Sequence, residues 1–163
     1  MSERKRMGAI LVENGVLWQE AVEDILNQQV ESHRPFGVLT RELYGISEKE
    51  IWKAYAEQMA PFFPKVEMTT EQRDESVADA ITIRDAWAHH VLPLRTEGSA
   101  MICATTEQHL PEAMAYAYTK LDRYAQFVLT EEHQLEHFIM QLFAKAGEKT
   151  ESTETPKTVS NEA

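Results

Sequence analysis

The sequence repeats itself between residues 6 and 58, and this repeat constrains the fold more than any other feature of the chain. When the sequence is shifted by 29 positions, as from Gly8 to Gly37, several apolar residues fall on apolar residues. The matched pairs are Gly8 with Gly37, Ile10 with Leu39, Leu17 with Ile46, Val22 with Ile51, and Gln29 with Gln58. Self-similarity at a fixed period indicates that one supersecondary unit is built twice.

Each copy has the pattern of two helices joined by a turn. A short apolar stretch comes first, a turn follows near Gly15 or Gly45, and a longer amphipathic segment completes the unit. In the second copy Ser47 and Glu50 have the spacing of a capping box, which marks the start of a helix. The sequence therefore predicts two packed helix–turn–helix units over residues 6–60.

The pattern changes at residues 61–64, where two prolines bracket two phenylalanines and end the helical period. Beyond this point helical and strand-like periods alternate. We expect helices over residues 75–87, over 110–124 and after 130, and strands over 91–94, 100–104 and 126–129. Pro93 places the first strand at a sheet edge. The predicted fold is α+β, with a helical repeat subdomain (6–60) followed by a small α/β subdomain (61–146) of about three short strands.

Composition sets the broad class. Residues 147–163 are polar and lack an apolar period, so we expect a disordered tail there. The net charge of −11 argues against broad contact with nucleic acid, which needs a basic face. The sequence has no apolar run of the roughly 18 residues that a membrane helix needs. Its single cysteine, Cys103, cannot form an intramolecular disulfide. We expect a cytoplasmic protein that neither inserts into a membrane nor binds nucleic acid.

Catalytic motifs are sparse. His133 and His137 form an H-x-x-E-H pattern, which puts both histidines on one helix face as in a class of zinc proteases. A solvated helix face is favoured, because such short matches arise by chance and a catalytic zinc needs a third ligand. His89 and His90 are adjacent and point apart. Cys103 lies in an apolar run, as a buried cysteine does. The sequence contains no P-loop, G-x-G-x-x-G or G-x-S-x-G motif, so we expect no catalytic residue and no metal.

The first copy also carries groups suited to a nucleotide. Arg6 supplies a planar cation that pairs with phosphate, and Gly8 permits a ligand to approach the backbone closely. The aliphatic side chains could wall a purine, and Gln29 could hydrogen-bond its edge. Helix packing alone requires glycine and aliphatic residues at the same spacings, so these residues by themselves favour a structural interpretation.

Residues 6–17 read RMGAILVENGVL, and Gln29 closes the copy. This run resembles the R-L-G-x-x-L-V-x-x-G-x-I…L-x-x-x-L-x-x-Q motif in the N-terminal domain of type II secretion and type IV pilus assembly ATPases, the GspE family of bacteria. The resemblance covers residues 6–143. In that family the domain precedes the ATPase core and couples it to partners. Since this sequence has no counterpart of the core, the resemblance implies a free-standing module that does not hydrolyse ATP.

The subtype of this domain with two intact motifs, the MshEN type, binds cyclic-di-GMP. Carried over by position, the resemblance implies ligand contacts by Arg6, Gly8, Leu11, Gly15, Val22, Leu26 and Gln29 in the first copy. In the second copy it implies contacts by Arg34, Gly37, Ile51 and Gln58. This copy departs from the motif because Pro35 stands where the motif has arginine. Arg34, one residue earlier, is taken as the substitute.

Two functions follow from these features, and a third is remote. The first is a non-catalytic docking or regulatory module, whose partners are secretion or pilus assembly proteins, including a separate ATPase. The second is a cyclic-di-GMP receptor that uses the first helical repeat and needs no other cofactor. The remote alternative is a zinc hydrolase built on His133 and His137.

Overall fold

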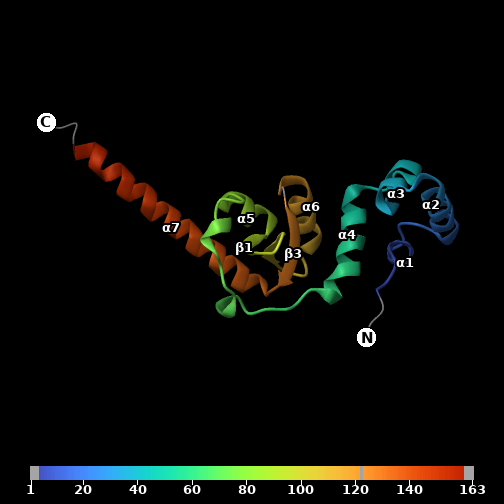
Figure 1. Ribbon diagram of the computed structural model, residues 1–163, viewed down its shortest axis with the longest axis horizontal. Coiled ribbons are helices and arrows are strands. Elements are labelled where there is room, and N and C mark those ends of the chain that lie inside the picture. Colours follow the sequence, from blue (N-terminus) through green and yellow to red (C-terminus); the bar gives the residue numbers. More distant parts are fainter. Residues whose placement is uncertain (1–3, 122, 160–163) are drawn as a thin grey trace.

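The structure is a computed structural model that describes residues 4–121 and 123–159. The helices are α1 (Met7–Glu13), α2 (Gln19–Ser32), α3 (Phe36–Tyr44), α4 (Glu48–Met59), α5 (Ile83–His89), α6 (Leu110–Lys120) and α7 (Glu132–Val159). The strands are β1 (Leu92–Glu97), β2 (Ala100–Thr105) and β3 (Tyr124–Leu129). Three short 3-10 turns, η1 (Ala60–Phe62), η2 (Met68–Thr70) and η3 (Glu75–Val77), connect α4 to α5. The α+β class expected from the sequence is confirmed, with α1–α4 before the sheet (Figure 1).

The two sequence copies form two helix pairs, α1–α2 and α3–α4, as the repeat predicts. Gly15 and Gly45 follow the first helix of each pair and adopt positive φ angles of 72° and 66°. Glycine adopts this left-handed conformation at little cost. In the second pair Ser47 caps α4 by accepting a hydrogen bond from the backbone N–H of Glu50, which the capping-box spacing predicted.

Glycine holds the two helices of each pair close together. A Cβ atom at Gly8 would lie 2.6 Å from Cγ1 of Val22, and a Cβ atom at Gly37 would lie 3.1 Å from Cγ2 of Ile51. Each glycine therefore faces the branched aliphatic residue of its own copy, and the same glycine–aliphatic contact occurs in both copies. The core of this helical part consists of Ile10, Leu11, Leu17, Ala21, Val22, Ile25, Leu39 and Ala54.

The three strands form one sheet in the order β1-β2-β3. β1 and β2 are antiparallel and joined by a turn at Gly98, whereas β2 and β3 are parallel and joined through α6. β2 is the central strand, and all six of its residues are buried. Met101 and Cys103 face the core that contains α6, whereas Ile102 and Ala104 face the core that contains residues of α5 and α7. Helices thus cover both faces of the sheet, which explains the unbroken apolar run.

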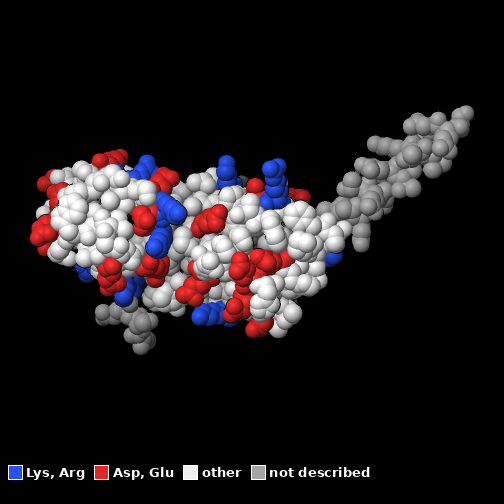
Figure 2. Space-filling view, turned by 180° about the vertical axis from the view of Figure 1, so that it is seen from behind, with Lys and Arg blue, Asp and Glu red and all other residues white. Residues whose placement is uncertain are grey.

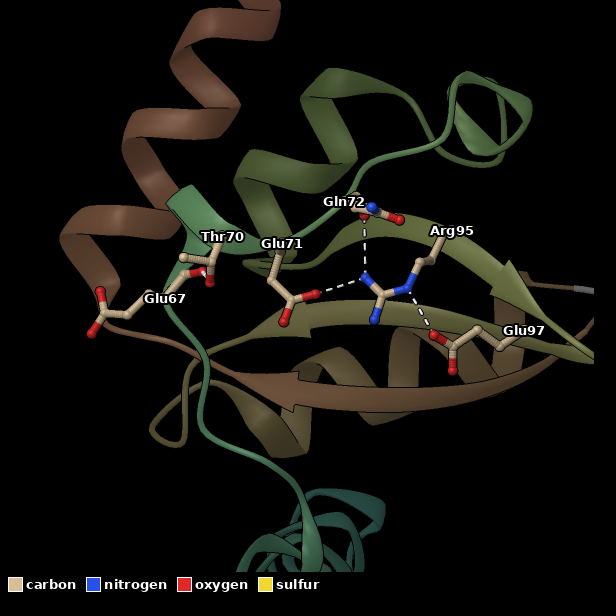
Figure 3. Close-up of polar contacts among 6 residues, drawn as sticks. All are labelled: Glu67, Thr70, Glu71, Gln72, Arg95 and Glu97. Atoms are coloured by element: carbon tan, nitrogen blue, oxygen red, sulfur yellow. Dashed lines mark hydrogen bonds and ion pairs between the residues drawn. The ribbon is translucent and has the colours of Figure 1, made fainter.

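An ion-pair cluster attaches the segment between η2 and η3 to the edge strand. Arg95 of β1 contacts Glu71 at 2.7 Å and Glu97 at 2.8 Å, and it donates a third hydrogen bond to the carbonyl of Gln72 at 3.1 Å (Figure 3). The hydrogen bonds to Glu97 and Glu71 raise the pKa of the Arg95 guanidinium. Because the Glu71 side chain is only 15% exposed, this pair holds the connecting segment against β1.

Several boundaries differ from the sequence-based expectation. The single helix expected over residues 75–87 is wrong: η3 ends at Val77, and α5 starts afresh where Thr82 accepts a hydrogen bond from the N–H of Asp85. The helix expected over residues 110–124 ends at Lys120. Capping and strand pairing, rather than apolar period, set these boundaries.

The disordered tail expected over residues 147–163 stays a prediction. α7 continues to Val159, and the remaining residues 160–163 lie outside the described residues. Within the described range no helix is both long and apolar enough to cross a membrane. The division at residue 60 stays a prediction, because α4 packs against α6 across it.

The paired glycines yield a test of stability. We expect Gly8→Ala to destabilise the protein by about 1–3 kcal/mol, because the added methyl meets the stiff, buried side chain of Val22. Gly37→Ala is the matched control: it occupies the same helical position, and its milder contact is offset by the better helix propensity of alanine. Urea denaturation measures both. The double variant Gly8→Ala/Val22→Ala should lose less stability than the sum of the losses in Gly8→Ala and Val22→Ala, and strict additivity would contradict the proposed contact.

Candidate functional site

The candidate ligand residues of the first copy divide into a buried and an exposed set. Leu11 is 0% exposed and Val22 is 6% exposed, and both belong to the core between the repeat helices. Gly8 is buried against Val22. Gly8 lies against Val22, and Leu11 belongs to the same core as Val22, so the structure gives each of the three residues a packing role.

The exposed set lies at the ends and outer faces of the helices. Arg6 is exposed directly before α1, where it takes the N-cap position. Leu26 is 41% exposed on α2, and Gln29 is half-buried near the end of that helix. Gly15 has open space around its Cα. The first copy therefore presents Arg6, Gly15 and Leu26 to solvent.

In the second copy, polar candidate residues already have partners. Arg34, taken as the substitute for the motif arginine, forms a two-pronged ion pair with Glu42. The hydrogen bond between them raises the pKa of Arg34 and lowers that of Glu42. Gln58 donates a hydrogen bond to the carbonyl of Lys5 at 2.8 Å and accepts one from Arg4 at 3.3 Å. The structure thus brings Gln58 beside the segment that carries Arg6, whereas Arg34 is engaged within its own copy.

A groove of about 630 Å³ lies between the second repeat unit and the α/β part. Its aromatic lining comes from α3, α4, the residue after η1, α6 and β3: Phe36, Trp52, Tyr55, Phe63, Tyr118, Tyr124 and Phe127. Trp52 forms the centre of this group, with its ring 5.5 Å from that of Tyr118 and 6.0 Å from that of Tyr55. We call this cavity the aromatic groove. Gly37 and Ile51, two of the candidate ligand residues, also line it.

Two tyrosine side chains that line the aromatic groove are largely exposed to solvent. Tyr118 is 78% exposed and Tyr124 is 67% exposed. Arg41 and Arg123 also line the groove, and Arg41 is ion-paired with Glu48. Contiguous apolar surface rimmed by polar groups is typical of a binding site. The sequence does not reveal this site, because its lining residues are spread from 7 to 127, and only the position of Tyr118 outside the buried face of α6 hints at it.

The surface charges agree with the composition. On the face that Figure 2 shows, basic side chains are scattered among acidic ones, and no continuous basic area crosses it. A nucleic-acid backbone would need such an area.

The sequence-based candidates for catalysis are dispersed. His133 and His137 are exposed on α7. His89 stacks on Tyr116 and lies 3.7 Å from Glu112, whereas the neighbouring His90 stacks on His109, so the two adjacent histidines do point apart. The group of side chains within the described ranges that could hold a metal ion consists of His90, His109 and Glu132. It does not include either histidine of the H-x-x-E-H pattern.

The chain has similar solved structures among known proteins. No protein-family model and no curated protein sequence matches the chain. Similar solved structures include that of MshE with cdg, which is 24% identical, covers 85% of this chain and 99% of the other, and has a TM-score of 0.45. The N-terminal domain of XpsE, solved in two crystal forms, is 16% identical and covers 86% of this chain with a TM-score of 0.44 in each. It is covered over 97% and 98% of its own length.

Cys103 yields a chemical test. Burial raises the pKa of its thiol to about 12, so the thiolate is scarce at neutral pH. At pH 8 we expect the native chain to react with a thiol reagent roughly 1,000-fold more slowly than the chain unfolded in guanidinium. The raised pKa also means that the unfolded chain loses this proton first. The thiol's contribution to stability is therefore complete below about pH 9 and falls as the pH rises towards 12. Equal reaction rates in the two states would refute a buried thiol.

Proposed function

We propose that this chain is a non-catalytic docking and regulatory module that couples type II secretion or type IV pilus machinery to a partner protein in the bacterial cytoplasm. The observation that carries the proposal is the aromatic groove, with Tyr118 78% exposed and Tyr124 67% exposed at its rim. Tyrosine anchors of this kind dominate the binding energy of many protein interfaces. The doubled motif over residues 6–58 adds the resemblance to a domain that couples an ATPase to its partners.

The proposed partner inserts apolar side chains into the groove. Of the groove's lining residues, most are apolar or aromatic, and the charged ones, among them Arg41, Glu48 and Arg123, carry both signs. Such a lining suits an amphipathic protein segment whose apolar face is buried and whose polar residues meet the charged rim. The candidate partners are the cytoplasmic proteins of the assembly machinery, including a separate ATPase.

The test uses the full chain and purified cytoplasmic components of the secretion or pilus system, titrated one by one in a calorimeter. We expect one component to bind, and Tyr118→Ala/Tyr124→Ala to weaken that binding at least about 10-fold, because two exposed tyrosine anchors are lost. Val30→Ala is the matched control, since Val30 is 74% exposed on α2 and does not line the groove. Binding that survives the tyrosine changes, or the failure of every component to bind, would refute the proposal.

The second candidate function is a cyclic-di-GMP receptor, which the exposed Arg6 favours, together with Gln58, which hydrogen-bonds the carbonyl of the preceding residue, Lys5. An arginine placed before a helix can pair with a phosphate, and glutamine can hydrogen-bond a purine edge. MshE, to which the chain is similar, has been solved with cdg.

Titration with cyclic-di-GMP separates this second candidate from the docking proposal. A receptor should bind the nucleotide in the wild-type chain and lose the binding in Arg6→Ala, but keep it in Arg84→Ala, an exposed arginine on α5. Binding that Arg6→Ala leaves unchanged would move the ligand away from the first copy. If no heat is released at high micromolar nucleotide, the repeat serves packing alone and the receptor function is refuted.

A further inference from the structure

Three side chains with metal-binding groups meet at one end of the sheet. His90 precedes β1, His109 follows β2, and Glu132 follows β3 at the start of α7. β1 begins opposite the end of β2, because the two strands are antiparallel. β3 finishes at the same end of the sheet, because it is parallel to β2 and its last residue, Leu129, pairs with Thr105. The topology of the sheet therefore brings together three residues that lie far apart in the sequence.

The distances suit a single ion. One ligand atom from each of His90, His109 and Glu132 lies within 4.8 Å of the others, and Nε2 of His90 is 3.8 Å from a carboxylate oxygen of Glu132. Bonds of about 2.0–2.1 Å to a tetrahedral zinc ion place its ligand atoms about 3.4 Å apart. Two imidazole nitrogens and one carboxylate oxygen also form the donor set of open zinc sites, in which water completes the coordination.

Neighbouring threonines hold both histidines in place. The hydroxyl oxygen of Thr106 lies 2.8 Å from Nδ1 of His109 and also accepts a hydrogen bond from the backbone N–H of that residue. With Nδ1 engaged in this way, Nε2 is the nitrogen that His109 offers to a metal. A hydrogen bond from the second ring nitrogen is the usual support of a metal-bound histidine.

His90 is fixed through its backbone. Thr105 donates a hydrogen bond to the carbonyl of His90 at 2.7 Å, and the residue adopts a left-handed conformation with φ of 53°. Side chains other than glycine adopt this conformation at a cost. Nδ1 of His90 is buried and has no hydrogen-bond partner among the described residues, so no hydrogen bond from this nitrogen fixes the rotation of the ring, and Nε2 is the nitrogen nearest to Glu132.

We propose that His90, His109 and Glu132 bind one divalent transition-metal ion of the zinc type, with water in the fourth position. The two imidazole rings now stack in parallel, with centroids 3.7 Å apart and planes 4° apart, so their lone pairs do not converge. Because Thr106 holds the ring of His109, binding turns the ring of His90 about its Cβ–Cγ bond until Nε2 of both histidines points at the ion. The ion then links the segment before β1, the loop after β2 and the start of α7. This inference does not depend on the docking function.

The test titrates the full chain, freed of metal with a chelator, with Zn²⁺ in a calorimeter and with Co²⁺ in an absorption spectrometer. We expect one equivalent of Zn²⁺ to bind, and Co²⁺ to give the intense visible bands of a four-coordinate ion. Zn²⁺ should also raise the temperature of unfolding, because it binds the native state preferentially. His109→Ala and Glu132→Gln should each weaken Zn²⁺ binding at least about 10-fold, and Thr106→Val should do so through loss of the hydrogen bond to His109.

The matched control is His133→Ala/His137→Ala, which removes the exposed histidines of the H-x-x-E-H pattern on α7. These changes should leave Zn²⁺ binding unchanged. Glu132→Gln keeps the shape of a side chain that is 49% exposed, so it reports on binding even where a histidine variant fails to fold. The proposal is overturned if Zn²⁺ does not bind, if Glu132→Gln binds it as the wild type does, or if the control variant loses it.

Discussion

Helix α4 contributes to two hydrophobic cores at once, and the arrangement of the molecule depends on this. Ala54 is fully buried in the core of the repeat helices, whereas Ala56, 4% exposed, packs in the core that contains α6 and one face of the sheet. Two positions on a helix are about 200° apart, so these alanines lie on opposite sides. Their small size lets α1 approach from one side and α6 from the other. A larger side chain at Ala54 would push α1 away from α4 within the repeat, whereas a larger one at Ala56 would push α4 away from α6.

The repeat itself is explained by packing. In both copies a glycine near the start of the first helix faces a branched aliphatic residue of the second, and these contacts account for Gly8, Val22, Gly37 and Ile51 without any ligand. This packing does not account for the polar residues at the ends of the helices. Gln58 fastens the segment before α1 through the carbonyl of Lys5, and Arg6, the next residue, is exposed. The repeat thus fixes the fold through its apolar positions and leaves Arg6, at the start of α1, as the residue with which to test nucleotide binding.

The aromatic groove and the metal-binding residues both arise where the parts of the chain meet. The groove forms because α4 lies against α6, so that aromatic residues from both parts face a common cavity. The histidines and Glu132 meet because the sheet mixes antiparallel and parallel pairing, which gathers three connections at one edge. Neither the groove nor the metal-binding cluster belongs to a single helix or strand. The affinity of a partner for the groove would depend on the packing of α4 against α6. An ion bound at the end of the sheet would stabilise the α/β part.

The sequence by itself determined the local structure. The repeat, the capping box at Ser47, the edge position of Pro93 and the buried strand around Cys103 depend on neighbouring residues and their periodicity, and each was predictable. Periodicity did not separate η3 from α5, because the hydrogen bond from Asp85 to Thr82 restarts the helix. Only the tertiary structure decided which distant residues meet. The groove between Trp52 and Tyr118 and the cluster of His90, His109 and Glu132 result from strand register and helix packing, which act between residues that no sequence spacing connects.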